Sequence, residues 1–238
     1  MNASFDVVIV GGGVTGAAVG YGLAKRGVKT CLVDAVPTFS RASRANMGLI
    51  WCQSKALGCP QFVRWGFASS RAYGNLAAEL KELSGIDTGY APTGGIIPCL
   101  GEAELEARAQ FIEKLRAETE DGTYPASVLS RKELEGMLPK VPFGPEVSGG
   151  IWSDMDGYVD PLHLMFAFRK SFVRLGGTLF AGERVSEVKP SGKGYAVVCG
   201  GRTLECGKAV LAAGLGVRKL AAQLGTDIPV FPNKSQVM

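Results

Sequence analysis

The stretch Phe5-Asp6-Val7-Val8-Ile9-Val10-Gly11-Gly12-Gly13-Val14-Thr15-Gly16 decides the fold of this 238-residue chain. The β-branched run before Gly11 is typical of a strand buried on both faces. The small residues from Val14 to Lys25 are typical of a helix that packs closely on a sheet, and a second apolar strand follows at Lys29–Asp34. Together these segments predict a βαβ unit of about thirty residues, the length that such a unit needs.

The glycines of this stretch have the spacing Gly-x-Gly-x-x-Gly, at Gly11, Gly13 and Gly16. The first allows a tight turn, the second lets a pyrophosphate approach the backbone, and the third lets helix and strand pack closely. The helix that follows points free N–H groups at the phosphates. Asp34 ends the next strand, where an acid accepts hydrogen bonds from ribose hydroxyls and disfavours NADP. The motif predicts an adenine dinucleotide and leaves NAD and FAD open.

Composition excludes several classes of protein. The chain has 26 Lys and Arg against 22 Asp and Glu, mixed along its length, so a nucleic-acid surface is disfavoured. The six cysteines have neither zinc-site nor disulfide-framework spacing, and we expect no metal site. With no secretory signal, we expect reduced thiols and a cytoplasmic location. Phe5–Ala24 has a membrane-spanning length, but its glycines and its change from strand to helix argue against a transmembrane segment.

The rest of the chain alternates helical and extended patterns. Helices are expected over Gln61–Leu83, Glu102–Glu118 and Asp160–Arg174, and the capping-box spacing of Ser130–Glu133 predicts the start of a shorter one. The expected strands are Gly94–Leu100, Thr178–Ala181, Arg184–Lys189, Tyr195–Cys199, Arg202–Cys206 and Lys208–Ala212, followed by a helix over Leu215–Leu224. This order predicts a dinucleotide-binding domain interrupted by a second lobe.

Several segments resemble the FAD-dependent amino-acid and amine oxidoreductases, the family of D-amino acid oxidase, glycine oxidase and sarcosine oxidase. Asp6–Asp34 resembles the start of these proteins. Ala42–Leu49 resembles the small-residue loop that passes the pyrophosphate and approaches the flavin. Glu183–Val185 resembles the strand whose backbone contacts the adenine, and Ala212–Gly214 resembles the second cofactor signature. The resemblance implies FAD as the cofactor.

The same resemblance implies an α/β fold: a Rossmann-type FAD-binding domain with an interleaved α+β substrate lobe, incomplete at the C-terminus. Thr93–Ile96 resembles the strand that enters the lobe, and Gly149–Pro161 resembles the return from it. We expect residues 1–90 to belong to the FAD-binding domain, 91–150 to the substrate lobe and 151–225 to the FAD-binding domain again. Residues 226–238 would begin a second substrate-lobe segment.

The resemblance also indicates which residues contact the cofactor. These are Gly11, Gly13, Val14, Thr15, Gly16, Asp34, Ala35, Ser43, Arg44, Asn46, Met47, Gly48, Val185, Ala213 and Gly214. For Ser43, Arg44 and Asn46 the alternative is an ordinary polar loop. No catalytic residue is assigned, because the family's Arg and Tyr that anchor the substrate carboxylate follow the part that this chain matches. The chain also departs from the family at Ser235, where glycine is usual.

The function expected from the resemblance is oxidation of the C–N bond of an amino acid or a secondary amine through an imine. The electrons would pass to oxygen or another acceptor. A second hypothesis is a non-catalytic or inactive FAD-binding fragment, or a subunit whose partner subunit supplies the rest. A third is an NAD-dependent dehydrogenase.

For four kinds of residue a structural role is expected instead of a functional one. His163 is the only histidine and is expected to be a partly buried helix residue rather than a proton carrier. Trp51 and Trp65 are expected in the core rather than beside a flavin. Arg218 is expected on a helix surface, and the cysteines are expected to be small buried residues.

Overall fold

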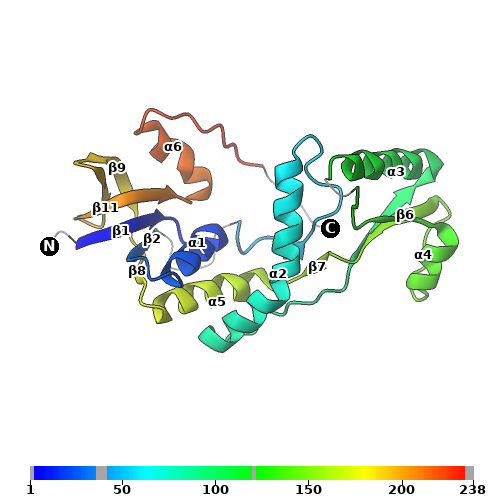
Figure 1. Ribbon diagram of the computed structural model, residues 1–238, viewed down its shortest axis with the longest axis horizontal. Helices are drawn as coiled ribbons and strands as arrows, with labels where there is room; N and C mark the ends of the chain where they lie inside the picture. The colour runs from blue at the N-terminus through cyan, green and yellow to red at the C-terminus, as the bar shows by residue number, and fades with distance from the viewer. Residues whose placement is uncertain (1–2, 36–41, 120–121, 234–238) are drawn as a thin grey trace. The chain divides into compact units, whose positions relative to one another are not determined.

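The computed structural model describes residues 3–35, 42–119 and 122–233 and divides into two compact units. Unit 1 comprises Met1–Asn46, Glu79–Thr88 and Pro161–Met238, and unit 2 comprises Met47–Ala78 and Gly89–Asp160 (Figure 1). The chain leaves unit 1 at residue 47 and returns to it twice. Unit 1 is therefore assembled from three separate stretches of sequence.

Unit 1 contains a six-stranded sheet in the order β8-β2-β1-β11-β10-β9. The strands are β1 (Ala3–Val10), β2 (Thr30–Asp34), β8 (Thr178–Ala181), β9 (Val185–Ser191), β10 (Gly194–Cys199) and β11 (Arg202–Leu211). The first four strands in the sheet order are parallel, and β10 and β9 continue the sheet as an antiparallel meander. This mixed sheet confirms the predicted α/β fold with a parallel core.

Both faces of the central strands are covered, as their unbroken apolar sequences require. Ile9 and Leu32 pack with Phe172 on the face that carries α1 (Val14–Ala24) and α5 (Pro161–Arg174). Val8 and Val33 face the other way and pack with apolar residues of the meander and of α6 (Val217–Ala222). A short 3-10 helix, η1 (Gly214–Gly216), precedes α6.

Three predicted segments of unit 1 differ from the structure. Arg202–Cys206 and Lys208–Ala212 were expected as separate strands, but they form the single strand β11. In the sequence, Gly207 was interpreted as the break between the two strands. A glycine also occurs inside a strand where another backbone lies close to it. This is the case here, because a Cβ on Gly207 would lie 3.2 Å from the Asp6 carbonyl oxygen. The helix expected over Leu215–Leu224 is shorter and begins as η1.

Unit 2 contains a three-stranded antiparallel sheet in the order β4-β6-β5. Its strands are β4 (Gly95–Leu100), β5 (Ser127–Ser130) and β6 (Val147–Ser153). A separate two-stranded pair joins β3 (Leu49–Ile50) to β7 (Gly157–Tyr158). Sequence patterns indicated β4 only, because β3 and β7 are two residues long and β6 carries two glycines that weaken a strand pattern.

Three helices belong to this part of the chain: α2 (Pro60–Ser84), α3 (Gly101–Ala117) and α4 (Arg131–Met137). Residues 79–84 of α2 are grouped with unit 1. Val63 and Phe67 of α2 pack in one core with Ile112 of α3. The predicted capping box at α4 is confirmed, because the Ser130 side chain accepts a hydrogen bond from the Glu133 N–H and the Glu133 carboxylate accepts one from the Ser130 N–H.

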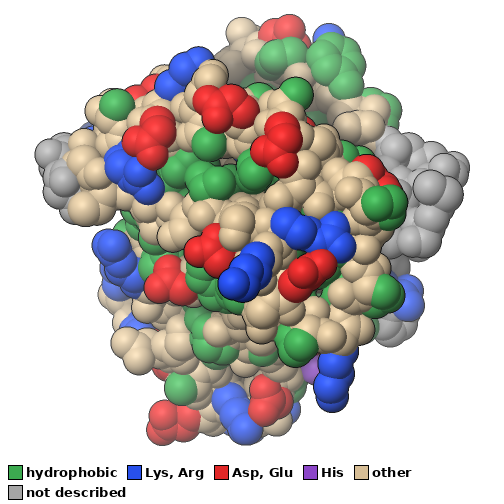
Figure 2. All heavy atoms as spheres, turned by 90° about the vertical axis from the view of Figure 1, so that its right-hand side faces the viewer, with side chains coloured by type: hydrophobic (Ala, Val, Ile, Leu, Met, Phe, Trp, Pro, Cys, Tyr) green, Lys and Arg blue, Asp and Glu red, His purple; other side chains and the backbone are tan. Residues whose placement is uncertain are grey.

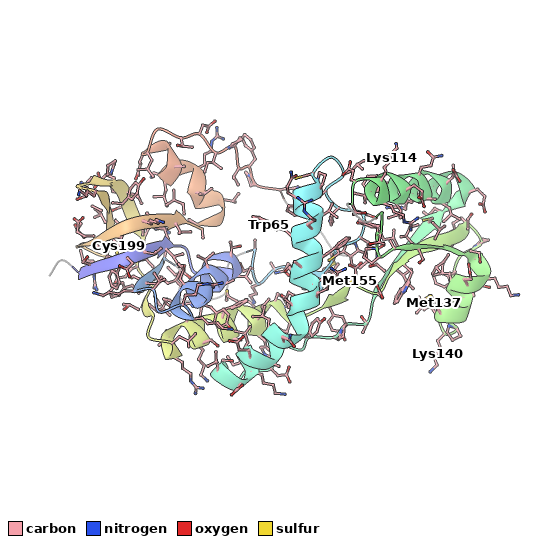
Figure 3. All side chains as sticks on the ribbon, in the orientation of Figure 1. Trp65, Lys114, Met137, Lys140, Met155 and Cys199 are labelled. Carbon is pink, nitrogen blue, oxygen red and sulfur yellow. The ribbon has the colours of Figure 1, made fainter. Side chains whose placement is uncertain are left out.

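Three side chains are more exposed than the sequence indicated. Trp65 is 78% exposed and projects from α2 (Figure 3), so the expectation of a core tryptophan is wrong. His163 is exposed rather than partly buried, and Cys59 is exposed whereas Cys199 lies buried among the strands of unit 1. Residue type alone therefore did not decide the burial of these side chains, because burial depends on the neighbours that the fold supplies.

Three further observations concern the surface charge, the hydropathy of the helices and the placement of metal-ligating side chains. On the face shown in Figure 2, acidic and basic side chains are interspersed. In the part of the chain that the structure describes, no helix is long and apolar enough to cross a membrane. Within those same residues, no group of three His, Cys, Asp or Glu side chains is placed to hold a metal ion.

Candidate cofactor site

At the glycine turn after β1, the end of β1, the start of α1 and the end of β11 lie so close together that a side chain would not fit between them. Gly11 has φ +105, and a Cβ at this position would overlap the carbonyl oxygen of Ala212. A Cβ on Gly16 would overlap the carbonyl oxygen of Gly11. The turn is also anchored, because Gly11 donates its N–H to Val33 at 2.8 Å. Glycine is therefore required at both positions for the end of β1 to pack against α1 and the end of β11.

The N-terminus of α1 faces this turn. Gly13, its N-cap residue, is extended and offers no side-chain cap, and the first turn of the helix holds no acid. The Val14 N–H donates to the Ser43 hydroxyl at 3.0 Å, across 29 residues of sequence. A Cβ on Gly13 would lie 2.8 Å from that hydroxyl oxygen. The partial positive charge of the helix end and its N–H groups, including those of Thr15 and Gly16, suit a phosphate.

Asp34 ends β2 and is only 3% exposed. Its backbone carbonyl accepts the N–H groups of Gly182 and Glu183 at 2.8 and 3.0 Å. This pairing places the start of β9, where Val185 lies, next to the end of β2, where Ala35 follows Asp34. The two segments expected to contact the adenosine half of a dinucleotide therefore meet.

The second cofactor signature, Ala212–Gly214, packs against the first one at Gly11–Gly16. Ala212 follows β11, donates its N–H to the Val10 carbonyl at 2.8 Å and packs against Gly11. Ala213 is the N-cap of η1, and Gly214 has φ +56. Two motifs about 200 residues apart in the sequence thus form one turn-and-helix edge at the carboxyl ends of β1 and β11, where open α/β sheets bind their ligands.

The predicted flavin-approaching loop is described from residue 42 onward. Asn46 donates its side-chain amide to the carbonyls of Ala42 and Ser43, at 3.0 Å each, so this contact closes the loop on itself. Arg44 is exposed, and Met47 is 65% exposed. Gly48 is buried and accepts a hydrogen bond from the Val159 N–H at 2.9 Å inside unit 2. Of this loop, Ser43 contacts the N-terminus of α1 beside the glycine turn.

Some segments named from the sequence lie outside the described residues. These are residues 36–41, which separate Ala35 from the loop, and residues 234–238, which include Ser235.

Two residues of this site were missed by sequence reasoning, Gly12 and Arg169. A Cβ on Gly12 would lie 2.6 Å from the Asp34 Oδ2. Arg169 of α5 places its guanidinium Nη1 3.5 Å from the same oxygen. A signal for Arg169 exists in the sequence, since it falls with Met165, Phe168 and Phe172 on the apolar face of an amphipathic helix. A cation on that face needs a buried anion.

A second buried acid, Asp156, is held in unit 2 by amide groups. Its Oδ1 accepts the Cys52 N–H at 2.5 Å and the Gln53 N–H at 3.4 Å, and its Oδ2 accepts the Gln53 side-chain amide at 2.7 Å. That amide also donates to the Gly95 carbonyl at 2.9 Å. Burial raises the pKa of the Asp156 carboxyl, although these hydrogen bonds act in the opposite direction. The cluster joins three segments of unit 2 and is a structural clip.

The residues of unit 1 fit the adenosine diphosphate half of FAD. The turn at Gly11–Gly16 leaves no room for side chains, the N-terminus of α1 is electropositive, and an acid closes the second strand. These features define a Rossmann-type dinucleotide-binding protein. The family model for FAD-dependent oxidoreductases, the DAO family, matches residues 6–238, and the chain belongs to this family. The predicted resemblance, and FAD as the cofactor of the family, are confirmed.

Individual relatives agree with the family. The chain is 35% identical over 234 residues to an opine oxidase subunit of Agrobacterium tumefaciens (strain Ach5), a match that covers 98% of this chain and 62% of the relative. It is 28% identical over 236 residues to glycine oxidase of Geobacillus kaustophilus (strain HTA426), covering 99% of this chain and 61% of that protein. A crystal structure of glycine oxidase from Geobacillus kaustophilus matches with a TM-score of 0.85 over 94% of this chain and 59% of that one. The chain therefore spans about six tenths of the length of these relatives.

Proposed function

We propose that this chain is the FAD-binding part of an oxidoreductase that oxidises the C–N bond of an amino acid or a secondary amine. The observation that carries the proposal is the meeting of the Gly11–Gly16 turn with Ala212 and with Asp34 at one edge of the sheet. Bound FAD supplies the two-electron oxidation, and the protein supplies binding, orientation and the exclusion of competing reactions.

The proposal gives each group of the site a role. The first N–H groups of α1, at Val14, Thr15 and Gly16, would hold the pyrophosphate beside the Ser43 hydroxyl. Asp34 would accept hydrogen bonds from the ribose hydroxyls. The remaining contacts are proposed from the resemblance: the backbone at Ala35 and Val185 for the adenosine, Ala213 and Gly214 for the pyrophosphate edge, and Arg44, Asn46, Met47 and Gly48 for the approach to the flavin.

The substrate class is proposed from the relatives. The opine oxidase subunit and glycine oxidase are 35% and 28% identical to this chain, and their names support an amine or amino acid as the substrate. Oxygen or another acceptor would receive the electrons. The division into residues 1–90, 91–150, 151–225 and 226–238 remains our proposal for how the FAD-binding domain and the substrate lobe alternate.

A second candidate function is a cofactor-binding subunit or fragment that depends on a partner subunit for activity. It is supported by the name of the opine oxidase relative, which describes one subunit of an oxidase. An NAD-dependent dehydrogenase has no such support, because the matching family is FAD dependent.

A cytoplasmic location is also proposed. All six cysteines are free, and burial raises the pKa of the Cys31, Cys199 and Cys206 thiols. Buried thiols with a raised pKa are unreactive, and free cysteines in this number support a reducing compartment.

The test uses the purified chain, reconstituted with FAD and freed of excess cofactor. We expect it to retain flavin, and anaerobic addition of glycine, sarcosine, proline, a D-amino acid or an opine-type secondary amine should bleach the visible flavin absorbance. Retained flavin without bleaching by any of these compounds would favour the subunit hypothesis. A chain that retains no FAD but binds NAD would overturn the proposal.

A further inference from the structure

The Asp34 carboxylate lies beside two residues, Gly12 and Arg169, that are outside the Gly-x-Gly-x-x-Gly positions. Its Oδ2 lies 3.5 Å from Nη1 of Arg169, and a Cβ on Gly12 would lie 2.6 Å from the same oxygen. The Asp34 and Arg169 side chains are 4% and 10% exposed, respectively. The pair is therefore an interior ion pair, which solvent screens much less than a surface pair.

The position of Arg169 is set by the packing of α5. Its neighbour Phe168 packs against Tyr21 of α1 with tilted rings whose centroids are 5.5 Å apart, and Phe172, one turn further on, is fully buried against α1. Figure 1 shows α5 running beside α1. Because Arg169 lies between these two anchors, its guanidinium is delivered to Asp34 by the same contacts that hold α5 on the sheet.

The chemistry of the site needs such a cation. An acid that accepts hydrogen bonds from ribose hydroxyls acts best as the ionised carboxylate, which is acceptor-only. A carboxylate buried to this extent is costly unless an opposite charge compensates it. A guanidinium beside Oδ2 supplies that charge, and it restricts the rotation of the carboxylate about its Cβ–Cγ bond.

We propose that Arg169 is a positioning residue that orients the Asp34 carboxylate toward the ribose hydroxyls of the adenosine half of FAD, with Gly12 leaving the space in which that carboxylate lies. The inference rests on the proposed function, because it assumes that the site of unit 1 binds the cofactor. It assigns Arg169 to ribose recognition rather than to the fold alone.

The experiment measures two probes, ADP and 2′-deoxy-ADP, as competitors of FAD for the purified chain, with flavin fluorescence as the readout. The wild-type chain should bind ADP at least about tenfold more tightly than 2′-deoxy-ADP, since a hydrogen bond to a charged group is lost with the hydroxyl. In R169M this ratio should fall to about threefold or less, with R169K between the two. K170M, which changes the exposed neighbour on the same helix, should keep the wild-type ratio.

A purely structural role for Arg169 would weaken both nucleotides equally, so an unchanged ratio in R169M overturns the inference. If R169M does not fold, R169K and G12A decide the question, because a methyl group at residue 12 displaces the Asp34 carboxylate and leaves residue 169 an arginine. Wild-type ratios in both of these variants also overturn it. A wild-type chain that binds FAD but does not distinguish the two probes contradicts this inference alone, whereas a chain that binds no FAD contradicts the proposed function.

Discussion

Among the residues that the structure describes, each of the two units buries one carboxylate, and the two carboxylates have different surroundings. Asp34 in unit 1 is 3% exposed and lies against the guanidinium of Arg169. Asp156 in unit 2 is 1% exposed and is held by N–H groups of Cys52 and Gln53. Burial raises the pKa of Asp156 despite these donors, and the nearby charge of Asp154 acts in the same direction.

The difference shows what each carboxylate is suited to do. Amide dipoles satisfy the lone pairs of Asp156, but they bring no net positive charge, so desolvation dominates. An arginine compensates the charge itself, which suits an acid that faces a ligand. The acid of unit 2 is suited to joining chain segments, and the acid of unit 1 is suited to binding.

The largest effect is expected from breaking the pair in unit 1. R169M should lower the free energy of unfolding by about 3 to 5 kcal/mol, because it removes the arginine charge beside the buried Asp34 carboxylate. The double variant D34N/R169M should lose less than the sum of the two single variants, since the neutral amide needs no cation. Urea unfolding of the four proteins measures both quantities. Additive losses would show that the 3.5 Å pair contributes no coupling.

A smaller effect is expected at the clip in unit 2. D156N should cost about 1 to 3 kcal/mol, because an amide NH₂ would replace the oxygen that accepts the Gln53 side chain. The variant removes no counter-ion, so its cost comes from hydrogen-bond geometry. Urea unfolding of the apoprotein is the measurement. A loss as large as that of R169M would remove the distinction between the two acids.

The pH dependence of this cost has a defined sign. The pKa of Asp156 is higher in the folded chain than in the unfolded chain. Its protonation therefore stabilises the fold fully below the ordinary aspartate pKa of about 4, and this contribution is lost as pH rises through the folded pKa. The stability difference between wild type and D156N should be larger at about pH 4 than at about pH 7. A difference that grows with pH would mean that the donors outweigh burial.

The smallest effect is expected at Asp154, an exposed acid on the same turn as Asp156. D154N should change the free energy of unfolding by less than about 0.5 kcal/mol. It should also lower the pKa of Asp156, because it removes a neighbouring negative charge. The wild-type pH dependence should then shift to lower pH, which titration of the unfolding free energy would detect. A large loss of stability in D154N would show that it is not a surface control.

Sequence patterns identified the elements whose signals are local. The βαβ unit and the acid at Asp34 follow from apolar runs and glycine spacing within about thirty residues. The capping box of Ser130 and Glu133 and the proline at the start of α5 are likewise local. The short strands β3 and β7 have no such signal, because a two-residue strand exists only through its partner.

In the candidate site, too, the residues with a local sequence signal were predicted and those placed by long-range contacts were not. Gly11, Gly16 and Asp34 were predicted from their spacing, and Ser43 was predicted from the resemblance. Arg169 was missed although it lies on an apolar helix face, because its anion is 135 residues away in the sequence. The contact of Gln53 with Asp156 spans 103 residues and has no local pattern.

The amino-acid sequence by itself determined the class of this protein. The order of strand, glycine turn, helix, strand and acid restricts the backbone to one kind of nucleotide-binding edge, since few residues other than glycine fit such a turn. Only the tertiary structure decided how the two buried acids are compensated. Compensation depends on which distant side chain the packing delivers, an arginine from α5 at one acid and the amides of a loop at the other. Charge and burial act through space, and the separation of residues along the chain does not reveal them.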